Sequence, residues 1–145
     1  MIWGITLVPH GRISFLIPVL FENLAKSELW TKGRATIDDI LTFLYTGQMN
    51  LWAIYSEDGK VHAFIITEIK QYPRCKMLIL QYTAGDYGVI DAAEDITLTT
   101  LEQFAKDTGC SGIEAIGRIG WKSRAKKHGF LAATMVYEKY FEVKS

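Results

Sequence analysis

Residues 51–82 read LWAIYSEDGKVHAFIITEIKQYPRCKMLILQY, and this stretch decides the fold. The runs on either side of Asp58-Gly59 are rich in β-branched and aromatic residues. Asp-Gly between two such runs is a strong hairpin signal, because both residue types tolerate the turn. A second turn at Tyr72-Pro73 leads into a third run, Cys75–Tyr82. The stretch therefore predicts three consecutive antiparallel strands.

Helical patterns lie on both sides of this meander. The clearest follows a Thr36–Asp39 capping box, with apolar residues at helical spacing as far as Leu44. Helices are expected over Pro18–Trp30, between Thr36 and Gly47, over Asp91–Thr108 and over Ile119–His128. Single strands are expected over Met1–Val8, Ile113–Gly117 and Ala132–Val143. This order, β-α-α-β-β-β-α-β-α-β, predicts an α/β (α+β) fold with a mixed central sheet of about six strands flanked by helices.

Composition is typical of one soluble globular domain over residues 1–145. Hydrophobic residues make up 49% and charged residues 22%, which excludes disorder and a coiled coil. Sixteen basic and sixteen acidic residues give zero net charge, which counts against binding nucleic acid with the whole surface. Cys75 and Cys110 are too few for a disulfide framework, so both are expected to be reduced and packed. The apolar stretch Ile13–Phe21 is too short to span a membrane.

The element order and the segment IEAIGRIGWKSRAKKHGF (residues 113–130) resemble the GNAT superfamily of acyl-CoA-dependent N-acetyltransferases. Family members usually have a strand, then a helix, then a Lys and a closing Gly-Phe pair; Gly129-Phe130 matches that pair, and Lys127 matches the basic residue before it. The resemblance is best from about Leu51 to Phe130. It implies acetyl-CoA as the acyl-donor substrate and a small-molecule or protein amine as the acceptor. Three scattered His and two distant Cys lack metal-ligand spacing, so no metal is expected.

The resemblance also implies where the acyl donor binds. Two parallel strands, here Cys75–Tyr82 and Ile113–Gly117, would part to admit the pantetheine arm, and the pyrophosphate would meet backbone N–H groups beyond the first strand. The implied cofactor-binding residues are Gln81, Tyr82, Ala84, Gly85, Gly88, Arg118 and Lys122. The last two belong to a basic segment that would hold the 3′-phosphate of coenzyme A. The alternative interpretations are an ordinary surface turn at GDYG and a solvated helix face.

Acyl transfer to an amine needs a group that removes a proton from the amine. Glu68, near the end of a central strand, is the best placed catalytic carboxylate, and Glu114 is second. Even-numbered spacing predicts that His62 lies on the same sheet face as Glu68. Tyr137 on the expected last strand is the candidate proton donor. Packing or surface roles are the alternative for each of these residues.

Several residues depart from the family pattern. No Arg follows the strand that ends at Tyr82, Asp86 brings negative charge toward a phosphate, and Ala125 stands where many members carry a Tyr. A second hypothesis is therefore a catalytically inactive GNAT-like binding or assembly protein, of the kind that phages encode and attach to virions. A third is a nucleic-acid accessory protein that uses the basic helix. The first hypothesis places the protein in the cytoplasm, and the aromatic residues of the last strand would allow a homo-oligomer.

Overall fold

The computed structural model describes residues 2–31, 33–116 and 122–141. The chain divides into two compact units, Met1–Ala115 and Ile116–Ser145, and each is considered by itself. None of the described helices is both long enough and apolar enough to cross a membrane.

A five-stranded mixed sheet forms the first unit, with the strands in the order β1-β2-β3-β4-β5. The strands are β1 (Trp3–Leu7), β2 (Asn50–Ser56), β3 (Val61–Gln71), β4 (Lys76–Gly85) and β5 (Gly112–Ala115). Neighbours from β1 to β4 are antiparallel, whereas β4 and β5 are parallel. The predicted meander and the predicted mixed sheet are both confirmed.

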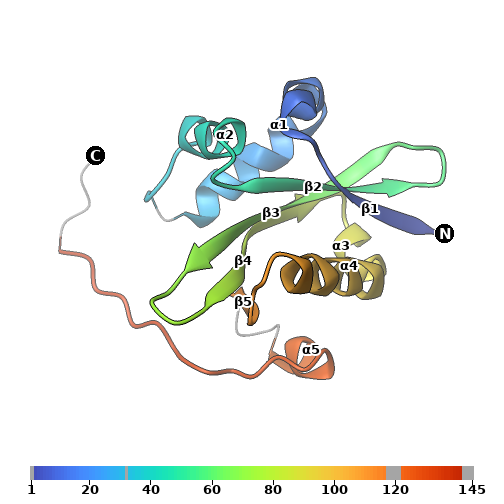
Figure 1. Cartoon of the computed structure of the whole chain (residues 1–145). Helices are drawn as coiled ribbons and strands as arrows, with labels where there is room; N and C mark the ends of the chain where they lie inside the picture. Colours follow the sequence, from blue (N-terminus) through green and yellow to red (C-terminus); the bar gives the residue numbers. More distant parts are fainter. Residues whose placement is uncertain (1, 32, 117–121, 142–145) are drawn as a thin grey trace. The chain divides into compact units, whose positions relative to one another are not determined.

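Helices cover both faces of this sheet (Figure 1). A short 3-10 helix, η1 (His10–Arg12), leads into α1 (Ile13–Trp30), and α1 and α2 (Ile37–Tyr45) lie over one face. The other face is covered by α3 (Val89–Ala92) and α4 (Glu94–Asp107). We call these the α1/α2 face and the α3/α4 face. Each has its own apolar cluster: Phe64 and Ile66 of β3 belong to the first, and Ala63 and Ile65 belong to the second.

The hairpin predicted at Asp58-Gly59 is confirmed. Gly59 has a φ of 81°, in the left-handed region that favours glycine, and its N–H donates to Ser56 O at 2.9 Å. The Tyr72-Pro73 turn is closed by a Tyr72 N–H to Cys75 O hydrogen bond of 2.8 Å. Both turns fix which residues of β2, β3 and β4 oppose one another.

The first long helix begins five residues earlier than predicted. It starts at Ile13, and Pro18 lies inside it. Ile13 and Leu24 are buried at 0% and 1% exposure, so the helix buries an apolar residue in its first turn. That burial outweighs the hydrogen bond that Pro18, on the exposed side, cannot donate.

The predicted sixth strand, Ala132–Val143, is wrong for the described residues. The second unit contains α5 (Lys122–Lys127), after which residues 130–140 have no regular secondary structure. The alternating apolar pattern is present, but a strand needs a neighbour that takes its backbone hydrogen bonds. The described part of this unit contains no second strand that would do so.

The capping box at the start of α2 gives a first test of the fold. Thr36 Oγ1 accepts from Asp39 N–H at 3.2 Å, and Asp39 Oδ2 accepts from Thr36 N–H at 2.9 Å. We expect Thr36→Ala to lower the free energy of unfolding by about 1 kcal/mol, because one helix N–H loses its acceptor. Urea denaturation measures this, with Thr36→Ser as the control that keeps the cap. Equal losses for Ala and Ser would contradict it.

Candidate functional site

The C-terminal half of β4 is an open strand edge within the first unit. Pairing with β5 runs only from Met77 to Leu80, whereas pairing with β3 continues to Gly85. Just beyond, Asp86 N–H donates to His62 O on β3 at 2.8 Å. Because backbone groups alternate along a strand, the N–H groups of Thr83 and Gly85 point to the opposite side. The expected parallel pair is present, and past Leu80 the outer edge of β4 pairs with no other strand among the described residues of this unit.

A register shift lies at the start of this open edge. Ile66 pairs with Tyr82, but Thr67 pairs with Leu80, so Gln81 has no partner of its own. This bulge reverses the side-chain alternation, since Leu80 packs on the α3/α4 face and Tyr82 on the α1/α2 face. The bulge therefore turns Tyr82 and Ala84 toward the α1/α2 face just beyond Leu80, where the pairing of β4 with β5 ends.

Glu68 lies beside this bulge with both carboxylate oxygens engaged. Gln81 Nε2 donates to Oε2 at 3.1 Å, and Gln48 Nε2, from the turn after α2, donates to Oε1 at 3.5 Å. Glu68 pairs across the strands with Ile79 and is half-buried. Two amide donors thus hold a carboxylate at the point where β4 loses its second neighbour. The sequence analysis named Glu68 as a candidate base and Gln81 as a candidate cofactor ligand but did not name Gln48, because no local pattern links residues 48 and 68.

Tyr82 follows the bulge and packs against the apolar cluster of the α1/α2 face. Burial raises the pKa of its phenol, and the negative charge of Glu68 raises it further. Both effects disfavour the phenolate, so Tyr82 is a neutral donor at ordinary pH. Ala84, two residues on, is partly buried and packs against the same cluster.

The two glycines predicted to bind pyrophosphate have different structural roles. A Cβ on Gly85 would lie 2.3 Å from Ala63 Cβ and 2.8 Å from His62 O, so this glycine allows β3 and β4 to approach. Gly88 has a φ of 79° and precedes α3, and a Cβ there would meet nothing within 4 Å. Of these two glycines, only Gly88 has open space where a Cβ would lie.

His62 is the unopposed residue of a second register shift. Ile54 pairs with Ala63 and Tyr55 with Val61, which leaves His62 between them. Its ring meets Trp3 edge-on at 5.4 Å, and Trp3 packs against the α3/α4 cluster. Glu68 lies on the other face with Gln81, so the prediction that His62 and Glu68 share a face is wrong. The extra residue breaks the even-numbered spacing on which that prediction relied.

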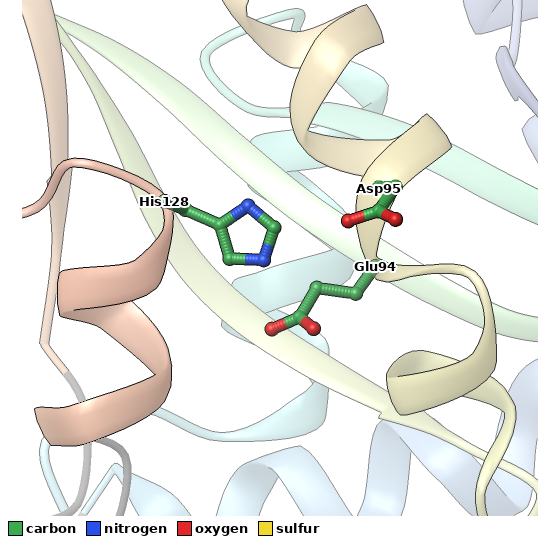
Figure 2. Close-up of side chains that lie close together, drawn as sticks. All are labelled: Glu94, Asp95 and His128. Atoms are coloured by element: carbon green, nitrogen blue, oxygen red, sulfur yellow. The ribbon is translucent and has the colours of Figure 1, made fainter.

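Carboxylates are frequent after β4. Asp86 precedes Gly88, Asp91 lies in α3, and Glu94 and Asp95 form the first turn of α4 (Figure 2). Acidic residues are favourable at a helix N-terminus, which explains Glu94 and Asp95 without a ligand. The predicted helix Asp91–Thr108 is in fact the two helices α3 and α4, and a four-residue α3 provides little helix dipole. Binding of a pyrophosphate beyond β4 would therefore depend on hydrogen bonds from individual backbone N–H groups.

The other candidate carboxylate, Glu114, is engaged elsewhere. Tyr72 OH donates to its two oxygens at 2.8 and 3.1 Å, and this hydrogen bond raises the pKa of Tyr72. Glu114 also lines an open hollow of about 510 Å³ near the β3–β4 turn, together with Tyr72, Pro73, Arg74, Cys75 and Met77. Glu114 thus lies in this hollow and accepts from the Tyr72 phenol, whereas Glu68 lies beside the bulge of β4.

Three predicted site residues belong to the second unit. Tyr137 is 87% exposed, in the segment without regular structure, and Lys122 begins α5. Arg118 lies outside the described residues. His128 follows the last residue of α5 (Figure 2). The first unit thus brings together Glu68, Gln81 and Tyr82, and it places Gly85 and Gly88 at the end of the same strand.

An antiparallel meander that passes into a parallel pair, with helices on both faces, is the architecture of the GNAT acetyltransferases. Solved structures of that class match the chain over nearly its whole length. Glucosamine-6-phosphate N-acetyltransferase from Arabidopsis thaliana matches with a TM-score of 0.67 at 17% identity, covering 98% of this chain and 100% of the other. Ribosomal-protein-alanine N-acetyltransferase from Brucella melitensis biovar Abortus 2308 matches with a TM-score of 0.64 at 16% identity, covering 95% of this chain and 99% of the other.

A third structure, an aminoglycoside 6'-N-acetyltransferase from Acinetobacter baumannii, matches with a TM-score of 0.65 at 10% identity, covering 98% of this chain and 99% of the other. No protein-family model and no curated protein matches the sequence. At these identities the likeness establishes the fold. The chain has the GNAT fold, in agreement with the resemblance seen in the sequence.

Proposed function

We propose that the protein is an acyl-CoA-dependent N-acyltransferase that transfers an acetyl group to an amine. The observation that carries the proposal is the open half of β4, with the carboxylate of Glu68 held beside its bulge by Gln81 and Gln48. A fold shared with N-acetyltransferases adds to it. The residues present fit an acyl-CoA thioester, because an extended amide-containing arm needs the unpaired backbone groups that Thr83 and Gly85 offer.

Each group of this chain then has a chemical role. The open edge of β4 binds the donor's arm and orients its thioester carbonyl, and an N–H at that edge stabilises the oxyanion as the amine attacks. The C–N bond forms, the C–S bond breaks, and Glu68 takes the proton that the amine loses. Gln48 and Gln81 orient the Glu68 carboxylate. In this proposal Tyr137 returns a proton to the departing thiolate, and Arg118 and Lys122 bind the 3′-phosphate.

The acceptor is expected to approach over the α1/α2 face. Glu68 and Tyr82 both lie on that face, and their surroundings combine one negative charge with a neutral phenol. A carboxylate attracts the ammonium form of the acceptor and then accepts its proton, so a primary amine suits this site. An acyl-CoA donor is consistent with a cytoplasmic protein.

Ligand-induced stabilisation tests the proposal. We expect millimolar acetyl-CoA to stabilise the folded chain by about 2.7 kcal/mol if it is present at a hundred times its Kd. Thermal unfolding with and without acetyl-CoA measures the shift, and free pantetheine is the control that lacks phosphate. Transfer to a panel of primary amines is then followed by thiol release. A chain that neither binds acetyl-CoA nor releases thiol would leave a non-catalytic binding module as the better description.

A further inference from the structure

His62 links two acidic segments that are far apart in sequence. Its Nδ1 lies 3.0 Å from Asp86 Oδ2, and its backbone oxygen accepts from Asp86 N–H at 2.8 Å. One residue therefore holds Asp86 at two points. Asp86 itself stands between Gly85 and Gly88, in the loop where the proposed donor's pyrophosphate would bind.

The other ring nitrogen of His62 faces the β2–β3 hairpin. Nε2 lies 2.9 Å from Ser56 Oγ, and the Ser56 hydroxyl donates to Asp58. That hydrogen bond, with the Lys60 N–H at 3.1 Å, lowers the pKa of Asp58. Asp58 is therefore a carboxylate at ordinary pH and takes the one hydrogen of Ser56.

These contacts suit a doubly protonated ring. When the Ser56 hydroxyl donates to Asp58, its oxygen can accept from a protonated Nε2 of His62. A protonated Nδ1 can donate to the Asp86 carboxylate at the same time. An imidazolium at His62 satisfies all three contacts together. The Ser56–His62–Asp86 order has the spacing of a nucleophilic triad, but Ser56 is 7% exposed and its proton is bound by Asp58, so it is not a nucleophile.

We propose that His62 is a positioning residue for the donor's pyrophosphate, acting through Asp86. This rests on the proposed function. Protonated His62 holds the Asp86 carboxylate on the β3 side of the loop and cancels its charge, which would otherwise repel phosphate. The Asp86 side chain is 64% exposed, so an unpaired charge there would reach a ligand.

The sign of the pH dependence follows directly. The charged groups that face His62 are Asp86 at Nδ1 and Asp58 through Ser56, with the Lys60 ammonium 4.0 Å from Asp58 Oδ2. Trp3, from β1, contributes an uncharged ring edge. An imidazole changes charge between about pH 5 and 8. Below that window Asp86 is neutralised and the donor binds tightly; above it Asp86 is uncompensated and binding weakens by about five-fold.

Acetyl-dephospho-coenzyme A is the probe for this inference. It keeps the pyrophosphate diester, whose charge is constant across the window, and lacks the 3′-phosphate monoester that titrates near pH 6. Calorimetry at pH 5.5, 6.5, 7.5 and 8.0 gives its Kd for the parent chain. We expect the Kd to rise about five-fold with pH.

Two variants separate the roles of the pair. Asp86→Asn is expected to bind at pH 8 as tightly as the parent does at pH 5.5, with no pH dependence. His62→Gln is expected to bind at every pH as weakly as the parent does at pH 8. Asp38→Asn, an exposed aspartate in the first turn of α2, is the matched control and should keep the parent's profile. Urea unfolding checks that each variant is folded. If His62→Gln is unfolded, Asp86→Asn alone still tests the inference.

A second readout does not depend on catalysis. The His62 ring resonances, assigned with His62→Gln, should titrate at a higher pH when the probe is saturating, because coupling between proton and ligand is reciprocal. A parent Kd that is constant from pH 5.5 to 8, or an Asp86→Asn variant that keeps the pH dependence, would overturn the inference and leave the proposed function standing. A parent chain that binds no acetyl-CoA at any pH would overturn both.

Discussion

Replacement of Glu68 by Gln is expected to lower kcat for acetyl transfer by about 10²- to 10⁴-fold and to leave acetyl-CoA affinity near the parent value. The amide keeps the size of the side chain, and its one oxygen still accepts from Gln81, while its NH2 group replaces the oxygen that faced Gln48. The amide cannot take a proton from the amine. The loss should therefore appear in kcat with little change in the free energy of unfolding. Initial-rate kinetics at saturating amine, together with donor binding by calorimetry, separate these effects.

Two other carboxylates make this experiment specific. Glu102→Gln, on the exposed side of α4, is the matched control and should retain parent activity. Glu114→Gln tests the other candidate base, whose oxygens accept from Tyr72 OH. A larger loss of kcat for Glu114→Gln than for Glu68→Gln would identify Glu114, on β5, as the catalytic base instead of Glu68. Equal activity of parent and Glu68→Gln would remove Glu68 from the reaction.

Gly85→Val is expected to lower the free energy of unfolding by about 3 kcal/mol. A Cβ at this position would lie 2.3 Å from Ala63 Cβ and 2.6 Å from Ala63 Cα. These atoms belong to the backbone and to the shortest side chain, so neither moves aside without shifting β3. The variant should unfold at lower urea concentration, with a reduced amount of native protein at ambient temperature.

Gly88→Asn is the control for Gly85→Val. Asn is the residue after glycine that best tolerates a positive φ, and open space surrounds Gly88. Its stability should fall by less than about 1 kcal/mol, so its donor affinity can be measured on folded protein. If Gly85→Val were as stable as Gly88→Asn, β3 and β4 would not need the close approach that the structure shows.

Local signals in the sequence predicted most of the sheet. Asp58-Gly59 and the Thr36–Asp39 capping box act within a few residues of themselves, and both features formed as predicted. The start of α1 could not be predicted from Pro18, because burial of Ile13 is a tertiary effect. The prediction of a last strand was wrong for a related reason. An alternating pattern indicates two faces, but a segment forms a strand only when a neighbouring strand takes its backbone hydrogen bonds.

The candidate site was predicted in part. Glu68 was named from its strand position, whereas Gln81 and Tyr82 were implied by the GNAT resemblance, and the structure places the three side by side. The register shifts at His62 and Gln81 could not be predicted, because an unopposed residue depends on how two strands align along their whole length. This is why the partnership of His62 with Asp86 and the contribution of Gln48 emerged only from the structure.

The division of the first unit into two apolar clusters has an evolutionary consequence. The sheet lies between them, so a substitution in one cluster touches no side chain of the other, and the stability effects of changes in both should add. The cluster under α1 and α2 borders the proposed amine site, whereas the cluster under α3 and α4 supports the strands from the opposite side. Descendants of this chain can therefore change the acceptor they recognise through the first cluster, while the second maintains a folded scaffold throughout the change.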